Sequence, residues 1–178
     1  EYAVDGTSSW SALTVSSGAA TIAITGANGT RTIYARATDY AGNASAAVSQ
    51  TIIMDTTAPI ISNASLTSPS GTYAKAGTLV TLTFDASDSG GSDLSGLPAV
   101  VFKSGGNAVA GSVSVTAGPV PSYTASYTTN AADSDGPISY TINAIDGAGN
   151  TAQLNAWLAA NGGTGAASDV CGGVTWSN

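Results

Sequence analysis

The segment ISYTINAIDGAGNTAQL, residues 138–154, carries the pattern that decides the fold. Apolar and polar side chains alternate along its first half, and successive side chains of a β-strand point to opposite faces of a sheet. The residues DGAGN, 146–150, then interrupt the alternation with residue types that favour turns. We therefore expect two antiparallel strands, 137–145 and 149–155, joined by a tight turn.

Similar alternating stretches precede this hairpin, and turn-forming residues separate them at roughly the spacing of a sandwich or barrel. From residue 59 onward, the expected strands are 60–66, 78–85, 98–103, 109–116, 122–129, 137–145 and 149–155. Seven short antiparallel strands in about 100 residues are typical of an immunoglobulin-like sandwich. Five earlier segments look like the last five strands of a similar unit: 1–4, 10–15, 19–25, 30–38 and 44–54.

An internal repeat supports this division. ARATDYAGN at 35–43 matches INAIDGAGN at 142–150, which makes Asp39 and Asp146 equivalent. Their separation corresponds to one sandwich domain per repeat. In both copies the Asp, Gly and Asn lie between two alternating segments, so the simplest interpretation is a hairpin turn.

These patterns predict an all-β protein made of tandem immunoglobulin-like antiparallel β-sandwiches, one complete and two partial. Pro59 prevents the preceding strand from continuing and marks a boundary. The expected domains are a partial one at 1–55 with the last five strands, a complete seven-strand one at 56–153, and the start of a third β module at 154–178.

The composition excludes several classes of function. The 178 residues include four Lys or Arg, eleven Asp or Glu, no His and one Cys, and the formal net charge is −7. Histidine-based triads, His-metal sites and cysteine clusters are therefore excluded. Four scattered cations are too few to replace the counterions of a nucleic acid. No apolar run approaches the roughly 20 residues of a membrane span.

The remaining composition favours a folded extracellular protein without catalytic activity. Charged residues make up 8% of the chain and hydrophobic residues 43%, which is too apolar for a disordered chain. Any secretion signal is expected outside this sequence, because it does not begin with a basic and apolar leader. Paired aspartates for glycoside hydrolysis are the one catalytic route left open, and they lie in turn-like segments without an aromatic cleft.

The motifs, taken together, resemble the tandem bacterial immunoglobulin-like repeats of large extracellular surface adhesins. The residues that carry the resemblance are VDG (4–6), TDYAGN (38–43), MDTTAP (54–59), DSDGPISYTI (133–142) and IDGAGN (145–150). The tail, with WLAANGG (157–163) and SDVCGG (168–173), resembles the start of a hyalin-repeat-like module. The resemblance implies a non-catalytic stalk, often stiffened by calcium, and identifies no ligand.

Calcium is the cofactor that this composition could serve, since it binds carboxylate and carbonyl oxygens. Strand order in a seven-strand sandwich predicts that five aspartates gather at the junction before the complete domain: Asp55, Asp85, Asp88, Asp93 and Asp146. Asp133 and Asp135 are expected at the opposite junction. The other interpretation is that these residues cap turns without a metal, as Asp commonly does.

Three functions stay open at this point. The leading one is a structural or adhesive repeat that spaces domains along a surface protein, with neighbouring repeats, a surface receptor or a glycan as partners. The second is a subunit of an extracellular filament, in which identical chains complete each other's sheets by adding strands. The third is an accessory module of a secreted enzyme.

A few single residues also carry predictions. Trp10, Trp157 and Trp176 are expected in sandwich cores rather than in a ligand site. Cys171 has no partner within the chain for a disulfide. Asn28, Asn43 and Asn63 begin N-x-Ser/Thr triplets, which a chain this rich in Ser and Thr produces by chance.

Overall fold

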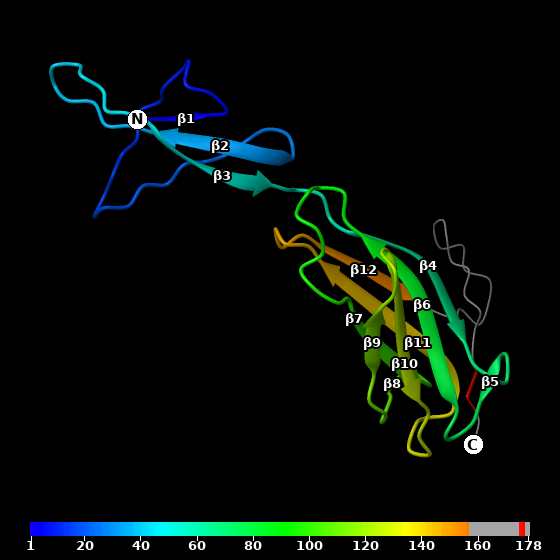
Figure 1. Ribbon diagram of the computed structural model, residues 1–178. Helices are drawn as coiled ribbons and strands as arrows, with labels where there is room; N and C mark the ends of the chain where they lie inside the picture. The colour runs from blue at the N-terminus through cyan, green and yellow to red at the C-terminus, as the bar shows by residue number, and fades with distance from the viewer. Residues whose placement is uncertain (157–174, 177–178) are drawn as a thin grey trace. The chain divides into compact units, whose positions relative to one another are not determined.

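The computed structural model describes residues 1–156 and 175–176 and shows an all-β protein (Figure 1). It has two compact units. The first comprises Glu1–Thr57 with Gly90–Ser92, and the second comprises Ala58–Ser89 with the described part of Asp93–Asn178. The expectation of an all-β fold is confirmed. Within the described residues, no helix is long and apolar enough to span a membrane.

The second unit is a β-sandwich. Its first sheet has the strand order β4-β6-β10-β9, with β4 at Ile60–Thr67, β6 at Leu79–Ser87, β10 at Ser122–Thr128 and β9 at Ser114–Ala117. The centre of its second sheet is β11 (Gly136–Ile145), which pairs with β7 (Ala99–Ser104) on one side and β12 (Thr151–Ala156) on the other. Short strands extend this sheet: β5 (Tyr73–Ala74), β8 (Asn107–Ala108) and β13 (Thr175–Trp176).

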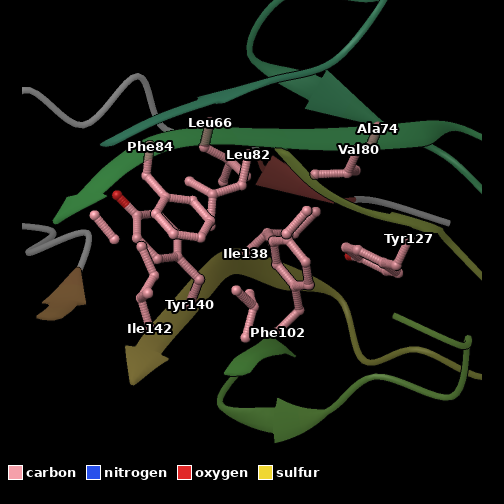
Figure 2. Close-up of a cluster of buried hydrophobic side chains, with 13 residues drawn as sticks. Leu66, Ala74, Val80, Leu82, Phe84, Phe102, Tyr127, Ile138, Tyr140 and Ile142 are labelled. Carbon is pink, nitrogen blue, oxygen red and sulfur yellow. The ribbon is translucent and has the colours of Figure 1, made fainter. Parts of the chain in front are cut away.

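The core lies between these two sheets, and Figure 2 shows its side chains. Alternate residues of the strands face inward, as their period of two predicts. The buried residues of β6 and β11 are Val80, Leu82, Phe84, Ala86, Ile138, Tyr140, Ile142 and Ala144. Phe102 from β7 meets Tyr127 from β10, with ring centroids 4.8 Å apart, so this aromatic pair joins the two sheets.

The expected strands of this unit match the observed ones closely except at 109–116. Only β9 forms there, and it begins at Ser114. The backbone N–H of Ala110 donates to the Asp133 carboxylate at 2.7 Å, so at this point the chain bonds to a loop side chain in place of a neighbouring strand. β6 also continues two residues beyond its expected end, to Ser87.

The first unit contains one antiparallel sheet, with the order β1-β2-β3. These strands are Tyr2–Val4, Gly29–Ala35 and Val48–Met54. The expected strands at 10–15 and 19–25 are wrong, because these segments form only isolated bridges, Tyr2 with Ser11 and Ser16 with Ala19. Backbone groups of a strand need a neighbouring strand as hydrogen-bond partner, and these segments pair at single positions only, too few to form a ladder.

Tryptophan does not fill the cores that the structure describes. Trp10 is half-buried in the first unit, where the Arg36 guanidinium lies 4.1 Å from its ring centroid and its Nε1 donates to the Thr7 carbonyl. The largest fully buried side chains of the second unit are instead Tyr127, Phe84 and Phe102. Trp157 and the side chain of Trp176 lie outside the described residues.

The C-terminal segment is described only in part. Residues 154–156 complete β12, and β13 pairs antiparallel with β11 and parallel with β5, so these described parts belong to the sheets of the second unit. The rest of the predicted third module, including Cys171, lies outside the described residues.

Candidate functional site

Asp146 organises the hairpin between β11 and β12. The residue is 1% exposed, and its Oδ1 accepts the backbone N–H groups of Ala148 at 2.9 Å and Asn150 at 2.8 Å. Oδ2 accepts the Asn150 side-chain amide at 2.9 Å. The aspartate therefore holds the turn through hydrogen bonds to residues two and four positions later.

Asp39 holds the corresponding turn of the first unit in the same way. Its Oδ1 accepts the N–H groups of Ala41 at 2.9 Å and Asn43 at 2.8 Å, and its Oδ2 accepts the Asn43 amide at 2.9 Å. The Asn43 side chain, with help from nearby backbone N–H groups, lowers the pKa of Asp39 below its usual range. The two copies of the sequence repeat thus share one local structure, and both have the turn that the sequence predicted.

Asp88 brings a second carboxylate close to Asp146 within the second unit. Each is the first residue after a strand, Asp88 after β6 and Asp146 after β11, and one carboxylate oxygen of each lies within 4.8 Å of the other. Asp93 joins this end of the sandwich through its backbone, since its carbonyl accepts the Gly147 N–H at 2.8 Å. Two carboxylates this close repel each other, and a hard cation that takes oxygen ligands would relieve that repulsion.

Asp85 takes a different position from the one expected. Because β6 runs to Ser87, Asp85 lies inside the strand and not in the loop that follows it. Its carboxylate accepts the Asn63 amide at 2.7 Å and the Ser122 hydroxyl at 2.8 Å. These two hydrogen bonds, Asn63 first, lower the pKa of Asp85. Asp85 therefore links β4, β6 and β10 on the outer face of one sheet.

Asp55 belongs to the first unit and is 8% exposed there. Its Oδ1 accepts the Thr57 N–H at 2.9 Å and the Asn28 amide at 3.3 Å, and its Oδ2 accepts the Ser92 N–H at 3.1 Å and the Ser92 hydroxyl. A Cβ on Gly90 would overlap this carboxylate, so any other residue there would have to displace the Asp55 side chain. Asn28, Gly90 and Ser92 were not foreseen, because their distance in sequence from Asp55 leaves no local signal.

Asp133 and Asp135 lie in the loop before β11. Asp133 is 6% exposed, and its two carboxylate oxygens accept the N–H groups of Ala110 at 2.7 Å and Asn130 at 2.8 Å. Asp133 therefore ties its own loop to the segment before β9. The side chain of Asp135 is exposed, and its backbone carbonyl lies close to Gly105, where a Cβ would meet it at 2.5 Å.

The first unit also has a groove on its sheet, with a volume of about 470 Å³. Its lining includes apolar side chains from the sheet and from the segment after β1, among them Leu13, Val15, Ala35 and Val48. Val15 is 62% exposed and Val48 71% exposed. All residues of this unit are described, and Ala3 is its single buried apolar residue. The sheet of the first unit therefore has no second sheet packed on it, unlike the sheets of the second unit.

Comparisons with protein-family models, with curated proteins and with solved structures found no match to this chain.

Proposed function

We propose that this chain is a non-catalytic structural segment of a secreted or cell-surface bacterial protein, which spaces and presents parts carried elsewhere on that protein. The observation that carries the proposal is the repeated turn. Asp39 and Asp146 make the same set of hydrogen bonds in two consecutive units. Tandem copies of one domain are an economical way to build a spacer, because each copy adds length without adding a new fold.

The strand order favours an immunoglobulin-like identity for the second unit. The main strands of its two sheets follow the orders β4-β6-β10-β9 and β7-β11-β12. Labelled A to G in chain order, these strands form ABED and CFG sheets, which is the arrangement of a constant-type immunoglobulin domain. A structural role is also supported by the aspartates, since Asp39 and Asp146 hold turns, Asp85 links strands and Asp133 ties two loop segments together.

Calcium is the ligand we propose for the end of the second unit where β6 and β11 finish. Asp88 and Asp146 supply carboxylate oxygens within 4.8 Å of each other, and calcium commonly takes its further oxygen ligands from backbone carbonyls and water. Asp55 stays a candidate ligand from the sequence alone. Asp85 and Asp133 are not part of this proposed site, because Asp85 lies within β6 and Asp133 lies before the start of β11, at the other end of that strand from Asp146.

Thermal unfolding against free calcium tests this proposal. A cation bound only by the folded protein raises the melting temperature as its concentration increases. At a concentration one hundred times the dissociation constant, it adds about 2.7 kcal/mol to the free energy of unfolding. We expect this rise in the native chain and its loss in Asp88→Asn. Asp135→Asn removes the same charge from an exposed loop position and is expected to keep the rise. No rise up to millimolar calcium, or an equal rise in Asp88→Asn, contradicts the calcium proposal.

A second function, a filament subunit assembled by strand addition, is favoured by the exposed groove of the first unit. An apolar sheet face beside an edge strand is suited to accept a strand from another copy, and β3 is an edge strand of this sheet. Native mass spectrometry distinguishes the two functions. Complementation predicts dimers or longer assemblies that Val48→Lys abolishes, because the lysine would place a charge in the groove. A monomer at all concentrations tested supports the spacer and contradicts the filament.

A further inference from the structure

The Asn28 side chain forms four hydrogen bonds with the three residues that follow β3. Its Oδ1 accepts the Thr56 N–H at 3.0 Å and the Thr56 hydroxyl at 2.9 Å. Its Nδ2 donates to Asp55 Oδ1 at 3.3 Å and to the Thr57 hydroxyl at 2.6 Å. An asparagine amide offers two donors and two acceptor positions, and here all four are used. We call this set, Asn28 with residues 55–57, the polar latch.

The residue after Asn28 gives this latch a chemical weakness. Gly29 begins β2, and as glycine it has no Cβ beside its backbone nitrogen. That nitrogen can attack the side-chain carbonyl carbon of Asn28 with little steric hindrance. Asn28 is itself exposed to solvent, which supplies the water that such a reaction consumes.

We propose that Asn28–Gly29 is a site of spontaneous deamidation, and that the conversion disables the polar latch irreversibly. The Gly29 nitrogen forms a bond to Cγ of Asn28, and Nδ2 leaves as ammonia, which gives a cyclic imide. Water then opens the imide at either carbonyl and produces aspartate or isoaspartate. The net reaction consumes one water and releases one ammonia, so no oxidant, reductant or enzyme is needed.

The product cannot rebuild the latch in full, because a carboxylate can still accept the Thr56 N–H but cannot donate to Asp55. The nitrogen that donates to Asp55 Oδ1 at 3.3 Å becomes a carboxylate oxygen, so a donor is replaced by a second negative charge. Asp55 is 8% exposed, and solvent screens such a like-charge contact poorly at a buried position. The bond that ties Asp55 to Asn28 is therefore lost and replaced by repulsion, which weakens the hold on residues 55–57.

The folded chain slows the same reaction. Attack on Cγ requires the amide to rotate away from Thr56 and Thr57, and Gly29 is also paired with Met54 in the sheet. The reaction therefore proceeds only when the latch opens, and the extent of conversion records how often that happens. An exposed asparagine without such hydrogen bonds would instead react at the same rate in the folded and the unfolded chain.

Peptide mass spectrometry of the full chain in mildly alkaline buffer tests the rate. Cleavage after Arg31 releases the peptide that contains Asn28, and the other Asn-Gly pair of the sequence, Asn161–Gly162, serves as an internal comparison. We expect conversion at Asn28 to be at least tenfold slower in native buffer than in urea, and Thr56→Val to accelerate it in native buffer. Equal rates in native buffer and in urea overturn the proposal.

Hydrogen exchange tests the consequence. Asn28→Asp reproduces the aspartate product, and the amides of residues 55–57 are expected to exchange several-fold faster in it than in the native chain. Asn43→Asp is the matched control, since it introduces the same change at the Asp39 turn and should leave 55–57 unchanged. Unaltered exchange at 55–57 in Asn28→Asp overturns the role of the latch even if deamidation occurs.

Discussion

Replacing Phe102 with alanine is expected to lower the free energy of unfolding of the second unit by about 4 kcal/mol. Phe102 is 1% exposed on β7 and packs against Tyr127 on β10, so its ring spans the space between the two sheets. Alanine would remove that contact and leave a cavity, and the side chains of both sheets that line the cavity would lose van der Waals contacts. The loss is a large fraction of the total free energy of unfolding of a typical domain.

Two variants control for this result. Val101→Ala changes the residue that precedes Phe102 in β7, which is 46% exposed, and is expected to alter stability little. Tyr127→Phe keeps the aromatic contact and removes a buried hydroxyl that has no hydrogen-bond partner among the described residues. Burial, aided by the charge of Asp133, raises the pKa of that hydroxyl. Because the variant removes a buried polar group without a partner, it is expected to be as stable as the native chain or slightly more stable.

Urea unfolding provides the measurement, with hydrogen exchange of the β7 and β10 amides to follow the second unit separately. The cost of Phe102→Ala should appear as a lower midpoint with an unchanged slope. A cost below that of Val101→Ala would mean that the two sheets do not depend on this aromatic pair. Such a result would contradict the sandwich core as described.

The fold of the second unit could be predicted because its signal is local. Alternation along β6 and β11 states directly which side chains face the core, and no remote information is needed. The same reasoning failed at 19–25, where the residues alternate but no neighbouring strand is present to pair with them. Periodicity reports the intrinsic suitability of a segment for a strand, whereas a sheet also requires a partner.

In the candidate site, likewise, local contacts could be predicted from the sequence and long-range contacts could not. Asp39 and Asp146 bond to groups two and four residues away, so their turns are visible in the sequence. Asp85 was expected in a loop, yet it bonds to Asn63 and Ser122, which reach it through strand pairing. Asn28 illustrates the limit most clearly, because nothing near it in sequence indicates that it contacts residues 55–57.

Asp146→Ala is expected to lower the free energy of unfolding of the second unit by about 3 kcal/mol when calcium is removed by a chelator. The substitution leaves the N–H groups of Ala148 and Asn150 without their acceptor at a turn whose aspartate is 1% exposed. Asp39→Ala removes the same hydrogen bonds in the first unit, but this aspartate is exposed, so water replaces them and the effect should be smaller.

The pair of variants separates a turn cap from a metal ligand at one residue. Thermal unfolding in chelator measures the cap alone, and repeating it in calcium adds any contribution of the ion. Asp146→Asn keeps one acceptor oxygen for the two backbone N–H groups, so its loss in chelator should lie between the native chain and Asp146→Ala. If Asp146→Ala and Asp39→Ala cost the same in chelator, burial does not govern the strength of the cap. If Asp146→Asn still gains the full stabilisation from calcium, Asp146 holds the turn and does not bind the ion.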